Sequence, residues 1–260
     1  MPRKKGGNTT AVYDTIFKNS KIKGSDGSQY IQFTLNNNHT IIAATGSMIC
    51  KSGGINKADL AFDGIVAGVK KILAGETFMY SKFTGNEKNG ILYLGSNFIN
   101  SILVLKIPYN KQIRISRHSF LASTENIKIT FTTQMRGILG IGQEEGMFLP
   151  LATCISEDHG YIWLSSYGSF EKIEIEDKDD IIVDNGMFLA CNNEQNYTIE
   201  SIGKSIISSY LSDEGYGMKF VGPVQIYIQT KNINDFYVIE SEAPNENNSI
   251  TKSIMNNMFE

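Results

Sequence analysis

Three glutamates at a constant spacing are the first residues of this chain that could do chemistry. Glu76, Glu145 and Glu214 are separated by 69 residues and again by 69 residues, and each precedes a short apolar run. General acid–base catalysis needs two carboxylates that converge on one site. Because each glutamate belongs to its own segment, we expect the three to lie far apart. We expect them to hold turns by accepting hydrogen bonds from backbone N–H groups.

The other residue types with catalytic or metal-binding chemistry are sparse. His118 follows Arg117 in a predicted turn, where a left-handed backbone conformation would account for it. Cys50, Cys154 and Cys191 include no CxxC pair, which argues against structural zinc and indicates a reducing compartment. Cys50 aligns with small residues elsewhere and is expected to be a buried, inert thiol. The sequence therefore predicts no catalytic residue, no metal and no cofactor, and we expect that the protein is not an enzyme.

The composition indicates a globular protein and disfavours a nucleic-acid-binding one. The 260 residues are 41% hydrophobic and 20% charged, which is ordinary for a globular protein. The formal net charge is −3 and the pI about 5.7, so binding along a nucleic-acid backbone is disfavoured, although a local basic patch can act alone.

The sequence also bears on location. No run of about 18 apolar residues occurs, so we expect no transmembrane segment. The first ten residues, MPRKKGGNTT, lack the apolar core of a secretory signal and are expected to form a flexible tail. We expect an intracellular protein, with the cytoplasm as the main location and mitochondrial association as the alternative.

Short alternating or apolar runs dominate the chain. YIQFTL, ILVLKI and FEKIEIE are typical of strands, and the 24 glycines lie mostly between such runs while prolines number only 5. This pattern predicts an all-β sandwich or barrel.

The runs recur in a fixed order. GILYLGS, GYIWLSS and VQIYIQT align, and each is preceded by a segment that we interpret as a hairpin: TIIAATGSMICKS, KQIRISRHSFLAS and DDIIVDNGMFLAC. The dipeptide Asn185-Gly186 is a strong signal for a two-residue turn with positive φ at both positions. Besides the three glutamates, the repeat is marked by the strand aromatics Tyr93, Trp163 and Tyr227 and by the turn residues Gly46, His118 and Gly186.

This order predicts three copies of one β unit of roughly 65–70 residues. The predicted limits are 1–28 for an N-terminal tail and lead-in, 29–98, 99–168 and 169–232 for the three units, and 233–260 for a polar C-terminal tail.

The segments GSMICKS, DGIVAGVKKILAGETF and DNGMFLAC resemble those of the TRAP-like proteins of the mitochondrial-biogenesis (altered inheritance of mitochondria) type. That family is related by fold to the tryptophan RNA-binding attenuation protein. The resemblance covers about residues 29–230. It implies three TRAP-like β-sandwich units per chain, each a short double-stranded β-helix with short helical insertions, and three chains in a ring of nine units.

Ring closure also has a physical basis. A small β unit leaves unpaired N–H and C=O groups at its edge strands, and stacking one unit on the next pairs them. Three tandem units still leave two free ends, which a cyclic assembly removes. We therefore expect a homotrimer.

The segment FDGIVAGVKKILAGE has an apolar helical face. Scaffold packing against the β core is the favoured role, because amphipathic helices of soluble proteins usually face their own core. Insertion into a membrane interface is the alternative. The face consists of Phe62, Ile65, Val66, Val69, Ile72 and Leu73.

Three functions remain open. The favoured one is a non-enzymatic ring-forming scaffold or interaction protein. The second is an RNA-binding ring, for which Lys111, Arg114 and Arg117 would supply charge, although the matching segment EIEDKDDIIVDN is acidic. The third is peripheral membrane association through residues 60–80.

Overall fold

The computed structural model describes residues 9–60, 80–131, 149–156, 158–192, 194, 197–201 and 216–232. Within these ranges it contains nineteen strands, the helix α1 (Thr9–Lys18) and the short 3-10 helix η2 (Asn185–Met187). The all-β class expected from the alternating runs is therefore confirmed. The predicted helical insertions lie outside the described residues.

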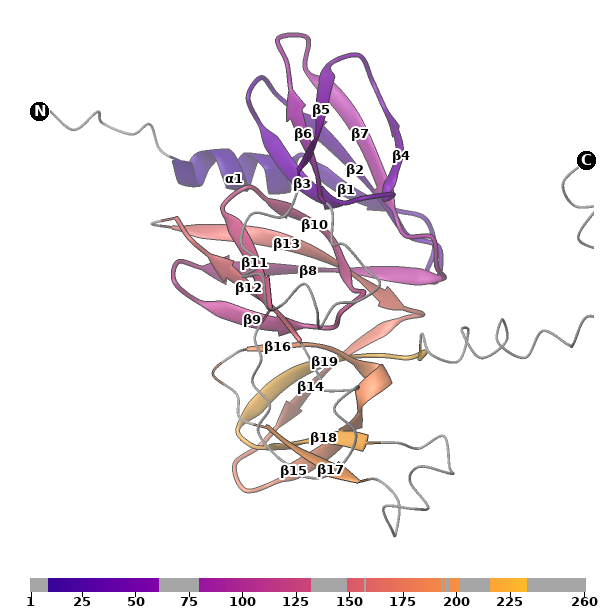
Figure 1. Cartoon of the computed structure of the whole chain (residues 1–260), viewed down its shortest axis with the longest axis vertical. Coiled ribbons are helices and arrows are strands. Elements are labelled where there is room, and N and C mark those ends of the chain that lie inside the picture. Colours follow the sequence, from indigo (N-terminus) through magenta and orange to yellow (C-terminus); the bar gives the residue numbers. More distant parts are fainter. Residues whose placement is uncertain are drawn as a thin grey trace, which may run out of the picture.

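The strands form four sheets (Figure 1). The first sheet has the order β1 (Ser20–Lys23), β2 (Tyr30–Leu35), β7 (Gly90–Gly95), β4 (Met48–Lys51). The second has the order β5 (Ile55–Leu60), β6 (Tyr80–Gly85), β3 (Thr40–Ala44), β10 (Phe120–Thr124), β13 (His159–Tyr167), β8 (Asn100–Pro108). The third has the order β11 (Ile127–Phe131), β12 (Pro150–Cys154), β9 (Gln112–Ile115), β16 (Phe188–Asn192), β19 (Val224–Gln229), β14 (Phe170–Ile175). The fourth has the order β15 (Asp180–Asp184), β18 (Tyr216–Val221), β17 (Tyr197–Ser201).

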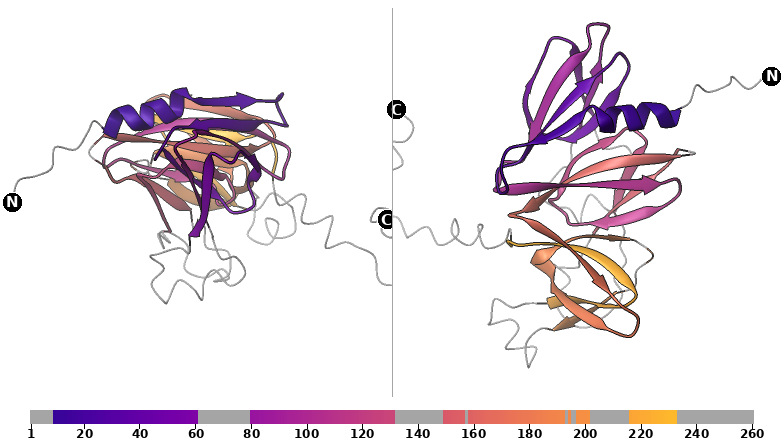
Figure 2. Two further views of the ribbon diagram at one scale, coloured as in Figure 1. Left: turned by 90° about the horizontal axis from the view of Figure 1, so that it is seen from above. Right: turned by 180° about the vertical axis from the view of Figure 1, so that it is seen from behind.

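The sheets follow one another along the long axis of the molecule, as the view in Figure 1 and the view from behind in Figure 2 (right) show. Three hydrophobic cores lie between them. The first core holds Phe33 from the first sheet and Trp163 from the second, both fully buried. The second core holds Leu164 from the second sheet and Ile115 from the third. The third core, between the third and fourth sheets, includes Phe220. Each inner sheet therefore contributes to two cores.

The two strands of each predicted hairpin lie in different, facing sheets, and this corrects the prediction. β3 pairs with β6 and β10, whereas β4, which follows it in the chain, pairs with β7 in the first sheet. β9 and β10 are separated in the same way, and so are β15 and β16. A hairpin would keep both strands in one sheet with one common face. Here the chain passes from one sheet to the facing sheet at each turn. The two strands that flank the turn therefore lie on opposite sides of one hydrophobic core.

The turns between these strands also differ from expectation at two of three positions. Gly46 has φ +85°, as its place in a turn predicts, but His118 and Gly186 do not have positive φ. At Gly186 the cause is visible: the carboxylate of Asp184 accepts a hydrogen bond from the Gly186 N–H at 2.7 Å and supports the right-handed η2 turn. Among the described residues, positive φ at non-glycine positions occurs at Asn38, Asn89, Asn110 and Lys178.

The helix α1 was missed by the sequence analysis, which assigned this part of the chain to a tail and lead-in. Its signal is the apolar spacing of Val12, Tyr13, Ile16 and Phe17, which places these side chains on one helical face. Tyr13 and Ile16 are buried in the first core. In Figure 1 the helix lies beside the first and second sheets.

A β-bulge recurs at one position in three sheets. Where β4, β10 and β16 pair with β7, β13 and β19, the register shifts by one residue and an aromatic then faces a small residue. The facing pairs are Tyr93 with Cys50, Trp163 with Ala122, and Tyr227 with Ala190.

The residue within the bulge is buried in two of the three sheets and exposed in the third. Leu121 is 2% exposed in the first core, and Leu189 is fully buried in the second core. Ile49, at the matching place in β4, is 58% exposed. Leu121 of the second sheet is therefore part of the first core, and Leu189 of the third sheet is part of the second core. Ile49 faces water in the single chain.

Replacing either bulge leucine tests this packing. Leu121→Ala and Leu189→Ala should each lower the free energy of unfolding by about 2–5 kcal/mol, because each removes buried methyl groups and leaves a cavity. Urea unfolding followed by the fluorescence of Trp163, the single tryptophan, measures the loss. Ile155→Ala, at a 58% exposed position, is the control and should change stability by less than about 0.5 kcal/mol. Equal effects at all three positions would contradict the assignment of the leucines to the cores.

Candidate functional site

Several predicted residues cannot be placed. Glu76, Glu145 and Glu214 lie outside the described residues, so their expected role in turns stays a prediction. The same holds for the apolar helical face of Phe62, Ile65, Val66, Val69, Ile72 and Leu73.

The three strand aromatics serve packing and local hydrogen bonding. Trp163 is fully buried, and its ring meets Phe33 edge to face at a centroid distance of 4.9 Å. The half-buried Tyr93 donates its hydroxyl to Gln32 Oε1 at 3.0 Å. The hydroxyl oxygen of Tyr227 accepts from Gln225 Nε2 at 2.7 Å. In Trp163 the ring faces are taken up by the core and are closed to a ligand.

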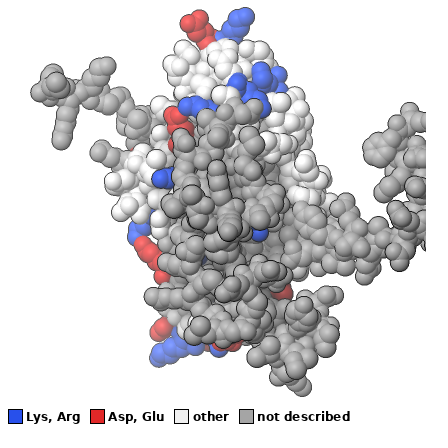
Figure 3. All heavy atoms as spheres, viewed as in Figure 1, with Lys and Arg blue, Asp and Glu red and all other residues white. Residues whose placement is uncertain are grey.

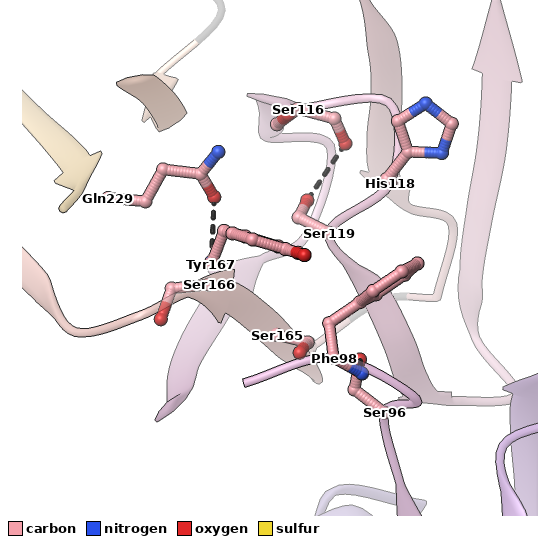
Figure 4. A pocket seen from close by; sticks show the side chains of 9 residues that line it. All are labelled: Ser96, Phe98, Ser116, His118, Ser119, Ser165, Ser166, Tyr167 and Gln229. Atoms are coloured by element: carbon pink, nitrogen blue, oxygen red, sulfur yellow. Dashed lines mark hydrogen bonds between the residues drawn. The ribbon is translucent and has the colours of Figure 1, made fainter. Parts of the chain in front are cut away.

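A small hollow lies between the ends of β7, β9, β13 and β19 (Figure 4). Its cavity volume is about 20 Å³, far below the roughly 300–1,000 Å³ of small-molecule sites. Its polar groups bond to one another: Ser119 Oγ donates to Ser116 O at 2.8 Å, and the backbone N–H of Tyr167 donates to Gln229 Oε1 at 2.9 Å. Its lining is Ser96, Phe98, Ser116, His118, Ser119, Ser165, Ser166, Tyr167 and Gln229. This arrangement holds the strand ends together, and we assign no ligand to it.

A cluster of titratable side chains joins α1 to β13. Asp14 Oδ1 lies 2.8 Å from His159 Nε2 and accepts a hydrogen bond from the Tyr161 hydroxyl at 2.6 Å. On the other side of the imidazole, Asp158 Oδ1 is 2.5 Å from His159 Nδ1. The imidazole therefore bridges two carboxylates, one at each ring nitrogen. Phe17 stacks on Tyr161 with ring centroids 4.4 Å apart.

The electrostatic interactions of the cluster favour the attachment of α1 to β13. Hydrogen bonds from Tyr161 and then His159 hold the pKa of Asp14 below its ordinary value of 3.8. Burial, together with the Asp14 carboxylate, raises the pKa of Tyr161. No serine or cysteine of the described residues takes part in these contacts, and the Tyr161 hydroxyl bonds to Asp14 and not to the imidazole of His159. Across the part of the chain that the structure describes, no group of three His, Cys, Asp or Glu residues is arranged to hold a metal ion.

The basic residues weighed for RNA binding have different environments. Arg114 is only 8% exposed, and its guanidinium lies 5.2 Å from the centre of the Tyr197 ring. Lys111 forms an ion pair with Glu194, whereas Arg117 is exposed. On the face shown in Figure 3, basic and acidic side chains of the described residues lie close together near both ends of the molecule. These positions do not combine into one basic surface.

The cysteines differ from expectation at one position. Cys154 and Cys191 are buried, and burial raises the pKa of the Cys191 thiol to about 12. Cys50, which was expected to be buried, is exposed, because β4 lies at the end of the first sheet.

Two edge strands are the candidate functional surface. All four residues of β4 are exposed, including Met48 at 39% and Ile49 at 58%. β15 ends the fourth sheet, and its Ile182 is 47% exposed. An open strand edge with exposed apolar side chains invites pairing with another strand.

None of the helices in the described ranges has the length and apolar character needed to cross a bilayer.

Removing the Asp14 carboxylate tests the docking of α1. Asp14→Asn should lower the free energy of unfolding by about 1 kcal/mol at pH 7, since the carboxylate is a third exposed and its bonds are partly screened. Because the folded protein lowers the pKa of Asp14, this contribution is present above about pH 4 and disappears as the pH falls through the lowered pKa. Urea unfolding at pH 6 and pH 3, followed by Trp163 fluorescence, measures the difference from wild type.

Asp26→Asn is the matched control for this variant. Asp26 is exposed and accepts one hydrogen bond, from Gln29 Nε2 at 2.9 Å, so its replacement should change stability by less than about 0.5 kcal/mol. A difference between Asp14→Asn and wild type that is the same at pH 6 and pH 3 would contradict the ionic role of Asp14.

Comparison with known proteins gives a fold relative and a family. A comparison with curated proteins finds no match. Among solved structures, a crystal structure of protein SPYM3_0169 from Streptococcus pyogenes is similar, with a TM-score of 0.67 and 20% sequence identity. The match covers 86% of this chain and 99% of that one. At this identity the likeness concerns the fold alone.

The family match extends over most of the chain. The model described as "Mitochondrial biogenesis AIM24" matches residues 20–231, which include every described strand. This confirms the resemblance to the mitochondrial-biogenesis type that the glycine-patterned segments indicated. The chain belongs to the AIM24 mitochondrial biogenesis family.

Proposed function

We propose that this protein is a non-enzymatic scaffold whose chain consists of three tandem TRAP-like β units and assembles into a homotrimeric ring. One observation supports this most directly. Successive units are joined inside the chain at two junctions, where β3 pairs with β10 and β9 pairs with β16. The strands at the corresponding positions of the last and first units, β15 and β4, each lie at the edge of a sheet.

The internal junctions serve as templates. At the first, β3 pairs antiparallel with β10, and Ala43 faces Ala122. At the second, β9 pairs antiparallel with β16, and Ile115 faces Ala190. β3 and β9 are the second strands of their units, and β10 and β16 are the third strands. Two strands at these positions have no such pairing partner in the chain: β15 is the second strand of the third unit, and β4 is the third strand of the first unit.

The strand orders are complementary. The fourth sheet holds three strands with β15 at its edge, and the first sheet ends in β4. Joined through these edges they give β17-β18-β15-β4-β7-β2-β1, whose first six strands match the order β5-β6-β3-β10-β13-β8 of the second sheet, with β1 added beside β2. The other open edges, such as β5, β11 and β17, correspond to one another and remain unpaired at every position among the described strands. The two ends of the chain are thus matched to each other.

A head-to-tail contact of this kind either closes into a ring or continues as a fibre. Membership of the AIM24 family supports closure through the architecture that the resemblance implies, with nine β units from three chains. The role of such a ring is to present a rigid, repeated surface to partners within mitochondrial biogenesis or a related process.

The native mass of the purified protein tests the assembly. We expect three times the 28.9 kDa mass of the chain by light scattering or native mass spectrometry at micromolar concentration, because the unpaired edges of β4 and β15 are satisfied only between chains. A monomer of 28.9 kDa under these conditions would defeat the proposal.

The same preparation also tests the RNA-binding alternative through its ultraviolet absorbance ratio. The scaffold proposal expects a ratio typical of protein, with the ring intact. A trimer that carries nucleic acid, released at high salt, would instead assign the ring to RNA binding.

A further inference from the structure

We infer that β4 of one chain pairs antiparallel with β15 of a second copy in one defined register, with Cys50 facing Val183 and with Ile49 inserted into the third core of that copy. The inference rests on the proposed ring and specifies its contact residue by residue. The occupant of each open edge is thus a second copy of this chain.

The register follows from the two internal junctions. Ala122 and Ala190 follow the bulge and face Ala43 and Ile115. Within the first sheet, Cys50 holds the place of these alanines, because it faces Tyr93 as Ala122 faces Trp163. Within the fourth sheet, Val183 holds the place of Ala43. The pairs Ile181–Phe220 and Ile182–Lys219 repeat the pairs Ile41–Phe83 and Ile42–Lys82.

Burial indicates what the second copy covers. The bulge residues at the two internal junctions, Leu121 and Leu189, are 2% and 0% exposed, whereas Ile49 is 58% exposed. The residues that precede them pack on different cores: Phe188 lies in the third core and Phe120 packs against the second. The side chain of Ile49 is therefore the part of β4 whose counterparts the internal junctions bury.

The third core lacks the matching contribution. The first core receives Leu121 and Ala122 from the strand that pairs with β3, and the second core receives Leu189 and Ala190 from the strand that pairs with β9. The third core contains Val183 of β15 but no residue from a strand paired beyond it, among the described residues. Ile49 and Cys50 of a second copy fill this place.

Charge agrees with the same register. Lys51 follows Cys50 and faces Ile182 in the inferred pairing. Asp180 and Asp184 lie two residues to either side of Ile182, on the same face of β15. Opposite charges at these diagonal positions lie within reach across an antiparallel pair. In the single chain Lys51 Nζ donates to Ile55 O at 2.9 Å and Asp180 pairs with Lys219 at 2.8 Å, so in the inferred contact Lys51 adds a cation beside an existing ion pair.

Disulfide trapping tests the register. In Val183→Cys, the new thiol and the native Cys50 of a second copy would face each other on one side of the sheet, within the geometry that a disulfide requires. Mild oxidation with diamide should give covalent dimers and trimers on a non-reducing gel, and dithiothreitol should reverse them. Cys191 competes poorly for oxidation, because its buried thiol has a pKa raised to about 12.

Two controls set the specificity. Val183→Cys combined with Cys50→Ser should give no covalent trimer. Ile182→Cys places the thiol one residue out of register, on the opposite side of the strand, and should cross-link to Cys50 at least about tenfold more slowly. A native trimer in which Val183→Cys does not cross-link would overturn the register while leaving the ring in place. A monomer would overturn the ring itself.

A second variant tests the insertion of Ile49 without a covalent bond. Ile49→Asp places a carboxylate in the third core of the neighbouring copy and should raise the concentration at which the trimer dissociates by at least about tenfold. Ile155→Asp introduces the same charge at a residue that is also 58% exposed and should leave dissociation unchanged. Circular dichroism of the Ile49→Asp chain should match wild type, because Ile49 faces water in the single chain. Equal dissociation of the two variants would reject the insertion.

Discussion

Backbone hydrogen bonding at the strand edges is the constraint on which the rest of this structure depends. A strand at the end of a sheet leaves a row of N–H and C=O groups without protein partners. The chain satisfies two such rows internally, by pairing β3 with β10 and β9 with β16. These pairings merge strands from successive parts of the sequence into the second and third sheets. The chain is therefore a continuous stack in which neighbouring parts share sheets.

Sharing sheets also determines where the apolar side chains are buried. Each inner sheet has a core on both faces, and all nine residues of β13 are buried as a result. The bulges in β10 and β16 add Leu121 and Leu189 to the cores of the preceding sheets. Burial of these leucines links the stability of one part of the chain to the next. Such coupling suits a rigid scaffold better than a protein that must open around a substrate.

The chemically reactive groups of the described chain serve the same architecture. Asp14 and His159 attach α1 to β13, and the side chains of Ser119 and Gln229 at the hollow bond to the backbone. The basic residue Arg114 is buried against an aromatic ring. Among the open strand edges, β4 and β15 are the two whose counterparts are paired inside the chain, and the chain belongs to the AIM24 mitochondrial biogenesis family.

The sequence by itself determined the strands, their buried faces and the family. In YIQFTL, alternation alone predicts that Ile31, Phe33 and Leu35 share the buried side, as they do. Only the tertiary structure decided which sheet each strand joins, and this is why the predicted hairpins were wrong and Cys50 is exposed where Ala122 is buried. The helix α1 could have been found from its apolar spacing, but its docking on His159 could not, since that contact joins residues far apart in the chain. The physical reason is general. Side-chain pattern states which face of a strand avoids water, whereas the backbone groups that choose its neighbour are the same at almost every residue.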